Sequence, residues 1–479
     1  MNGRGIILKT GTKLFVIFLI SGIVVTLSLS WIIEFYKYQK RLVPLDKVEG
    51  LFDNTVRTIK ETYPSEDRKE IARKVLGEYY KYKPNRKKML PIDVFKVIQP
   101  ALSVVNDQNF RLYPPTEPVY SVLPFTVTVV DGRVIVSSSA VKDIIAGDEV
   151  LEINGRKISE LIDLLLPYTS GENYSVREQQ LSSLIQLIPE LVDKKKDRIG
   201  IFYRQKEYNI KVMSDGAEKT VVVKTMTAMS YTRESVQFPA LPTRRPFEFY
   251  KEGDIGVFKF GTFSLSGTIY NTYREFLTNT LVYNKDMKVV LVDLRGVASR
   301  DFTIFKELFE HFVDERTSVE RWISIVNTAY NISVLNKYGV DFEKTTNELL
   351  RIKFFHTFEP REPVMKADVW ILFDRYTSNA ALDFIYTFKK LRKDRTIGEP
   401  TLMKINHTTE VDYKFDDSAK TSFMFPTAVI SEDTQRDVVL EPDYEIELST
   451  EERINYVKGI EDLMLNKALE IIKEHTVKR

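Results

Sequence analysis

The chain has 479 residues, of which 43% are hydrophobic and 28% are charged, and its formal net charge is +2. This length is too great for a single hydrophobic core and predicts two or three domains, while the balanced charge gives no reason to expect a nucleic-acid partner. Cysteine is absent, which excludes disulfides, cysteine-ligated zinc and a thiol nucleophile.

The four histidines of the chain are not spaced like metal ligands. They are His311, His356, His407 and His475. Histidine metal sites usually hold two ligands at a short fixed spacing, such as H-x-x-x-H, and nothing in the sequence suggests a site made of carboxylates alone. We therefore expect no metal and no cofactor, and we interpret His311 and His356 as ordinary surface or core histidines.

An apolar segment without a charge lies near the N-terminus, over residues 15–33. Its length is close to the ~20 residues that a helix needs to cross a bilayer. A cleavable signal peptide has a shorter apolar core that ends in small residues, whereas this segment is followed directly by Glu34. We predict a short tail at 1–13 and an uncleaved membrane anchor at 14–34. Basic residues flank both sides of the anchor, so charge alone does not set its orientation.

Residues 35–115 are predicted to form a helical domain. Val56, Ile59, Val75 and Tyr79 recur at helical spacings with charged residues between them. The segment contains no catalytic constellation, and we interpret it as a packing domain or a stalk.

The periodicity then changes to that of β-strands. Two β-rich runs surround Asp131-Gly132, a pair typical of a tight hairpin turn. Residues 147–155, GDEVLEING, precede a helical pattern and resemble the core of PDZ-like domains, which bind extended peptides at a sheet edge. A plain β-hairpin subdomain is the alternative.

We place the PDZ-like domain at 116–215 and a linker at 216–250. The linker is predicted because the stretch PALPTRRP near its end is rich in proline and arginine.

Residues 251–479 alternate between strand and helix patterns. The apolar runs at 289–294 and 369–373 are typical of strands buried on both faces of a parallel sheet. This rhythm predicts a mixed α/β core of βαβ units, interrupted by an irregular, aromatic-rich insertion at 313–360.

One stretch of this core combines a serine and a lysine. Ser378 follows the strand at 369–373 where a helix begins, and Lys404 follows the next short strand. A serine at such a turn with a lysine nearby can form a nucleophile and its base. Serine is also a common helix N-cap, and a lysine in a loop is usually solvated, so purely structural roles are the alternatives.

Taken in order, several landmarks resemble those of the C-terminal-processing (tail-specific) serine protease family. They are Asp293-Leu294-Arg295-Gly296, Thr377-Ser378, Gly398-Glu399-Pro400-Thr401 with Lys404, and Leu440-Glu441-Pro442-Asp443. The PDZ-like stretch precedes them, as in that family, and the resemblance covers roughly residues 100–450.

The resemblance implies a serine endopeptidase with a Ser/Lys dyad. Ser378 would be the nucleophile and Lys404 the general base, its pKa lowered by apolar neighbours. The oxyanion would be bound by backbone N–H groups near Gly296 and of Asn379. The resemblance also implies peptide or unfolded protein substrates. It places the body of the anchored protein outside the cytoplasm, in the periplasm or the extracellular space.

Two departures from the family pattern leave other functions open. Where the family usually has an asparagine and paired glycines, this chain has Gly296-Val297-Ala298-Ser299-Arg300, and glycine is the residue that turns a backbone N–H at no steric cost. The Asp-x-His motif of some branches is replaced by Asn106-Asp107-Gln108-Asn109, which argues against a histidine-based mechanism. A catalytically impaired, peptide-binding protein is one alternative, and a membrane-tethered scaffold without a peptide groove is another.

Overall fold

The computed structural model describes residues 42–477 except 84–86, 116–119, 193–205, 238–239, 243–244, 262–266, 300, 417–420 and 432–438. The predicted tail at 1–13 and membrane anchor at 14–34 lie outside the described residues. Within these described ranges, no helix combines the length and the apolar character that crossing a bilayer requires.

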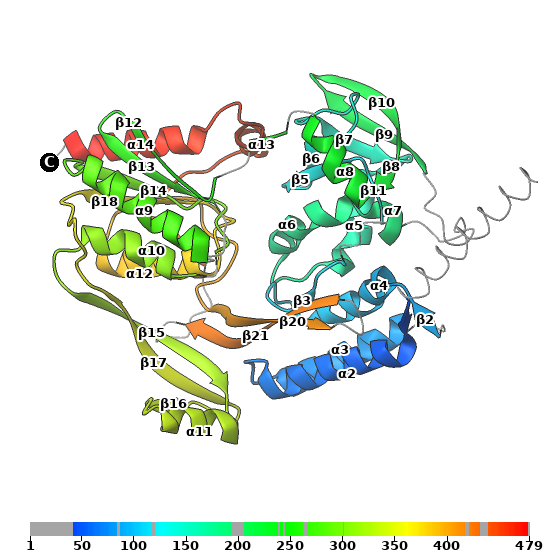
Figure 1. The fold of residues 1–479 in the computed structure, drawn as a ribbon, viewed down its shortest axis with the longest axis horizontal. Helices are drawn as coiled ribbons and strands as arrows, with labels where there is room; N and C mark the ends of the chain where they lie inside the picture. The colour runs from blue at the N-terminus through cyan, green and yellow to red at the C-terminus, as the bar shows by residue number, and fades with distance from the viewer. Residues whose placement is uncertain are drawn as a thin grey trace, which may run out of the picture.

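A helical region and a PDZ-like domain lie along one side of the molecule, and the α/β core lies along the other (Figure 1). The helical region contains three main helices and a two-stranded sheet. These are α2 (Leu45–Thr62), α3 (Arg68–Tyr82), α4 (Pro91–Leu102), β1 (Val43–Pro44) and β2 (Lys88–Met89). Phe52 of α2 stacks on Tyr79 of α3 with ring centroids 3.8 Å apart, so the apolar stripe predicted for this region packs one helix on the other.

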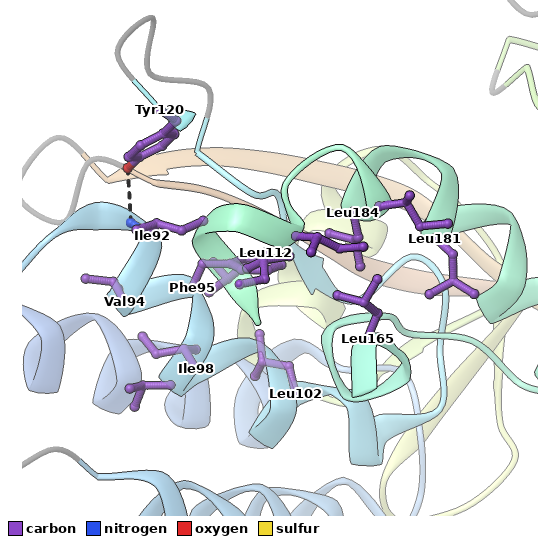
Figure 2. Packing of buried hydrophobic residues seen from close by; sticks show 14 of the residues in the cluster. Ile92, Val94, Phe95, Ile98, Leu102, Leu112, Tyr120, Leu165, Leu181 and Leu184 are labelled. Atoms are coloured by element: carbon purple, nitrogen blue, oxygen red, sulfur yellow. Dashed lines mark hydrogen bonds between the residues drawn. The ribbon is translucent and has the colours of Figure 1, made fainter. Parts of the chain in front are cut away.

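Helix α4 packs the helical region against the PDZ-like domain. Figure 2 shows Phe95, Ile98 and Leu102 of α4 in the same apolar cluster as Leu165 and Leu181 of the neighbouring domain. These side chains belong to one continuous buried core. Removal of such apolar surface from water is the main favourable term in folding, so the two regions stabilise each other.

The PDZ-like domain is a twisted sheet with helices on its flank. Its strand order is β10-β9-β7-β6-β5, and β8 pairs with β7. Asp131 and Gly132 join β5 to β6 with φ of 48° and 80°, as a two-residue hairpin turn requires. The elements are β5 (Phe125–Val130), β6 (Arg133–Ser139), β7 (Glu149–Ile153), β8 (Arg156–Lys157), α5 (Ile158–Leu165), α6 (Tyr174–Ile185), α7 (Ile188–Leu191), β9 (Glu207–Ser214) and β10 (Ala217–Lys224).

The segment at 216–250 carries regular secondary structure, unlike the linker predicted for it. Asp215 and Gly216 form a second tight turn with positive φ, which leads into β10 of the PDZ-like sheet. Short strand β11 (Met226–Thr227) then pairs with β4 (Ser121–Val122), and α8 (Ala228–Glu234) follows. The segment ends in β12 (Phe247–Glu252), which belongs to the core sheet.

The core contains a six-stranded sheet with the order β12-β13-β14-β18-β19-β22. Strands β12 and β13 are antiparallel, and the strands from β13 to β22 are parallel to one another. One face packs on α9, α10 and α12, and the other packs on α14, so the predicted mixed α/β architecture is confirmed. The elements are β13 (Ile255–Phe260), α9 (Gly267–Tyr283), β14 (Val289–Asp293), α10 (Thr303–Phe309), β18 (Asp368–Phe373), α12 (Ala380–Leu391), β19 (Thr396–Gly398), β22 (Tyr444–Glu445), α13 (Thr450–Lys458) and α14 (Leu463–Val477).

The insertion at 313–360 is regular rather than irregular, because it supplies three of the six strands of a second sheet. That sheet has the order β16-β17-β15-β21-β20, and β3 (Arg111–Leu112) of the N-terminal region pairs with β21. Its elements are β15 (Thr317–Val326), α11 (Ala329–Lys337), β16 (Phe342–Lys344), β17 (Leu349–Phe358), β20 (His407–Asp416) and β21 (Thr421–Ser431). The second sheet therefore brings the segment before β3 close to the loop between β19 and β20.

Candidate active site

Ser378 lies on a tight turn between β18 and α12, at the carboxyl end of the central sheet. Thr377 Oγ1 lies 3.0 Å from both the Asp374 carboxylate and the Leu294 carbonyl oxygen. The Ser378 N–H donates to the carbonyl oxygen of Val297 at 3.0 Å. The turn is thus fixed to the loop that follows β14, and Ser378 is almost completely buried. In open α/β sheets, functional sites usually lie beyond the carboxyl ends of the strands.

Asn379, and not Ser378, occupies the N-cap position of α12. Its φ of 57° and ψ of −130° are uncommon for a residue other than glycine. Such backbone strain costs about 1–3 kcal/mol and is concentrated at functional sites. The Asn379 side chain makes no capping hydrogen bond; instead its Nδ2 lies 3.4 Å from Ser378 Oγ. The interpretation of Ser378 as a mere helix cap therefore does not describe this turn.

Lys404 lies on a loop that runs beside the Ser378 turn. The Leu402 N–H donates to the carbonyl oxygen of Arg375 at 2.8 Å, and Lys404 forms a β-bridge with Val439. Its neighbours Met403 and Ile405 are buried, while Lys404 is half-buried. Within the described part of the chain, no hydrogen bond joins Ser378 Oγ to Lys404 Nζ, so the dyad stays a proposal.

In the loop after β14, the N–H groups of Gly296 and Val297 are both donated within the protein. Gly296, with φ of 67°, donates its N–H to Asp374 Oδ1 at 2.7 Å, and Val297 donates its N–H to the Leu294 carbonyl oxygen at 3.1 Å. A carboxylate is a strong acceptor, so the Gly296 N–H holds the Ser378 turn in place. The expected oxyanion role of Gly296 therefore differs from what the structure shows.

The N–H of Asn379, the other expected oxyanion donor, is directed at a sulfur atom. It lies 3.3 Å from Met403 Sδ. The side-chain amide of Gln108 donates to the same sulfur at 3.2 Å. No sequence pattern singles out Gln108 and Met403 as a contacting pair, since they are 295 residues apart.

Residues on either side of Gln108 hold this segment over the site. Asp107 accepts hydrogen bonds from Tyr63 Oη at 3.0 Å and from Thr408 Oγ1 at 2.9 Å. Asn109 Nδ2 donates to the Thr408 carbonyl oxygen at 2.9 Å and lies 3.4 Å from Asn379 Oδ1. The helical region thereby contributes directly to the surroundings of Ser378.

A buried charged cluster supports α12 one turn after Ser378. Asp383 lies 2.6 Å from His356 Nε2 and 2.8 Å from Arg321 Nε. Burial opposes its ionisation, but the hydrogen bond with His356 and the Arg321 charge hold the pKa of Asp383 below its usual value. Burial lowers the pKa of the nearby His407 to about 4, although the Asp383 charge acts in the opposite direction. Within the described residues, no group of three or more carboxylates and histidines has the arrangement of a metal site.

The PDZ-like domain contacts the Ser378 turn through Asp131. Its carboxylate accepts hydrogen bonds from Arg375 Nη1 at 2.9 Å and from Arg453 Nη1 of α13 at 2.7 Å. Arg453 also pairs with Glu399, which follows β19. The β5–β6 turn therefore contacts the Ser378 turn directly and is linked to the loop that carries Lys404 through Arg453.

Comparison with known proteins agrees with this architecture. Residues 119–236 match the family model described as a PDZ domain. Mature CPAF is similar in structure, with a TM-score of 0.61 and 12% identity over 86% of this chain and 95% of that chain. CPAF complexed with lactacystin gives a TM-score of 0.61 and 12% identity, covering 89% of this chain and 98% of that one.

A more distant likeness is to the photosystem II D1 C-terminal processing protease, with a TM-score of 0.41 and 13% identity over 87% of this chain and 98% of that chain. No curated protein sequence matches the chain significantly. The chain therefore contains a PDZ domain and has the fold of CPAF. The resemblance to the tail-specific proteases, with a PDZ domain ahead of an α/β core, is confirmed in fold.

Proposed function

We propose that this protein is a membrane-anchored serine-type peptidase that cleaves peptides or the C-terminal regions of proteins outside the cytoplasm. The observation that carries the proposal is the position of Ser378. It lies on a strained turn at the carboxyl end of the central strands, next to an N–H group whose present acceptor is only a thioether. A serine held in this way is placed for nucleophilic attack.

The proposed reaction uses Lys404 to move one proton. Ser378 Oγ adds to the carbonyl carbon of the scissile peptide bond as its proton passes to Lys404 Nζ, and that proton goes to the amine when the C–N bond breaks. Water then hydrolyses the resulting ester by the same two steps, restoring Ser378. The lysine must come within about 3 Å of the hydroxyl when substrate binds, a contact that is often longer in a free enzyme.

The proposed location rests on the apolar segment at 15–33 and on the family resemblance. Alkaline phosphatase fused after residue 41 should be active in a bacterial host, because that enzyme folds only outside the cytoplasm. An inactive fusion, together with release of the intact protein by a salt wash, would contradict both the anchor and the orientation.

Substitution of Ser378 tests the chemistry. Ser378→Ala should lower the hydrolysis of casein or of a tailed peptide by roughly 10³-fold or more, with no change in the melting temperature. Lys404→Arg should be as inactive, since arginine does not deprotonate in proteins. The control Lys393→Ala, at an exposed position, should remain active. If the wild type and Ser378→Ala are equally inert, the peptidase proposal fails.

A second function, peptide binding without hydrolysis, is favoured by one observation. The Gly296 N–H is already donated to Asp374, so the loop after β14 lacks a free donor at this position. In that case calorimetry would show equal peptide affinity for the wild type and Ser378→Ala, and neither protein would yield cleavage products.

A further inference from the structure

Two N–H donors converge on one atom beside the candidate nucleophile. The Asn379 backbone N–H and the Gln108 side-chain amide lie 3.3 Å and 3.2 Å from Met403 Sδ, and the methionine is buried with 2% exposure. Two fixed donors that share one acceptor next to a nucleophile have the geometry that an oxyanion requires. A thioether is only a weak acceptor, so these donors are poorly used at rest.

A second donor is sought elsewhere because two N–H groups of the loop after β14 are already donated within the protein. The Gly296 N–H donates to Asp374 and the Val297 N–H donates to Leu294. Side-chain amides serve as oxyanion donors in other hydrolases, as backbone N–H groups do. Gln108 is a side-chain amide that shares its acceptor, Met403 Sδ, with the Asn379 N–H.

We infer that Gln108 is the second oxyanion donor of this site and that the Met403 sulfur occupies the position which the substrate carbonyl oxygen takes. The inference rests on the peptidase function proposed above. When Ser378 Oγ adds to the carbonyl carbon, the π electron pair of the C=O bond moves onto oxygen. The resulting negative charge then lies between Gln108 Nε2 and the Asn379 N–H.

The surroundings fix the donors, and the inferred role of Met403 requires its side chain to change rotamer when substrate binds. Asp107 and Asn109 anchor the segment on both sides of Gln108 through Thr408. The backbone of Met403 is held by Thr401 Oγ1, which donates to its carbonyl oxygen at 2.8 Å, whereas the unbranched side chain has three rotatable bonds. An oxyanion is a far stronger acceptor than the sulfur it replaces. The interaction is therefore strongest in the transition state, which is the condition for catalysis.

Peptide hydrolysis by Gln108 variants tests the assignment. Gln108→Ala should lower kcat by about 10²–10³-fold, the usual effect of one oxyanion donor, while KM stays within about twofold. Gln108→Glu keeps the size of the side chain but replaces the donor with an acceptor, so its kcat should fall at least as much. The matched control Gln179→Ala, exposed on α6, should behave like the wild type.

Inhibition by a peptide aldehyde distinguishes an oxyanion donor from a residue that only supports the structure. The adduct of the aldehyde with Ser378 places an oxygen where the oxyanion forms, so Gln108→Ala should weaken its inhibition by a factor similar to the loss in kcat. Inhibition by the product peptide should not change. Met403→Leu removes the sulfur at similar volume and should raise the rate at which an alkyl fluorophosphonate labels Ser378 several-fold.

The failures of the two proposals are distinguishable. If the wild type is active, Ser378→Ala is inactive, and Gln108→Ala or Gln108→Glu keeps the wild-type kcat, the Gln108 assignment is overturned and the peptidase stands. A large loss of labelling in Met403→Leu overturns the role given to the sulfur. If the wild type neither hydrolyses peptides nor reacts with the fluorophosphonate, the peptidase function fails and the assignment fails with it.

Discussion

His407 illustrates at the scale of a single residue how the buried cluster beneath α12 depends on pH. It is buried close to Asp383 and Arg321, and burial lowers its pKa to about 4. In the unfolded chain its pKa is about 6.5. The folded protein therefore disfavours the charged imidazole, and the unfolded chain binds more protons between these two values.

The expected consequence is a loss of stability in acid. His407 contributes full stability above pH ~6.5 and loses about 3 kcal/mol as the pH falls to about 4. The free energy of unfolding, measured in urea from pH 7 to pH 4.5, should therefore fall less steeply for His407→Gln than for the wild type. His475→Gln, on α14, is the control. If His475→Gln reduced the pH dependence of stability as much as His407→Gln, His407 would not be the source of the acid sensitivity.

At the residue scale, the sequence predicted the position of Ser378 on a strand-to-helix turn, but not the side chains that surround it. Ser378 could be recognised because the strand, the turn and the helix that place it are contiguous in the chain. Gln108 and Met403 could not, because the second sheet brings them together across 295 residues. His356 was interpreted as ordinary, since its partner Asp383 lies on another element.

Gly398 shows what one position contributes to an element. It ends β19 with φ of 138°, and a Cβ there would lie 1.7 Å from the carbonyl oxygen of Phe373 on β18. Gly398→Ala must therefore separate the two strands that lead to Ser378 and Lys404. We expect a loss of more than about 3 kcal/mol in the free energy of unfolding.

The matched substitution is Gly77→Ala, on the exposed side of α3. Nothing lies within 4 Å of the added methyl group, and alanine in a helix interior gains about 0.5–1 kcal/mol over glycine. Urea unfolding of both variants gives the comparison. A similar cost at both positions would contradict the steric explanation.

Element types were predictable where the apolar pattern was simple. The strands at 289–294 and 369–373 form as predicted, because both faces of the parallel sheet are buried. The regular structure of 313–360 was missed because charges interrupt β15. One of them, Arg321, is fully buried with its guanidinium 4.2 Å from the ring centre of Tyr386. Asp215-Gly216 is the same hairpin-turn pattern as Asp131-Gly132, but it lies at the start of the linker predicted at 216–250, so β10 was not expected.

At the scale of the whole molecule, Asp131 joins the PDZ domain to the core. Its substitution tests how much this polar contact contributes to holding the two domains together. It pairs with Arg375 and Arg453, and these side chains are mostly buried. Asp131→Asn keeps a residue that tolerates positive φ but removes the charge. We expect faster hydrogen exchange in the β5–β6 hairpin, and a coupling energy of about 1 kcal/mol in a double-mutant cycle with Arg453→Gln.

The control for this cycle is Asp215→Asn. Asp215 occupies the corresponding position of the β9–β10 turn, with φ of 49°, and it is exposed. Asp215→Asn should leave the hydrogen-exchange rates of the β5–β6 hairpin unchanged. A coupling energy near zero between Asp131 and Arg453 would show that this ion pair does not help to hold the two domains together.

The pairing of β3 with β21 has a consequence for the newly made chain. Tyr113 and its contact Met424 are separated by 311 residues, and Phe110 packs edge-on against Phe423 with ring centroids 5.2 Å apart. At about 5–20 residues per second, ribosomes need roughly 15–60 s to synthesise the intervening chain. During that time the apolar surface that β21 will cover is exposed, so nascent chains should depend on a chaperone until the second sheet closes.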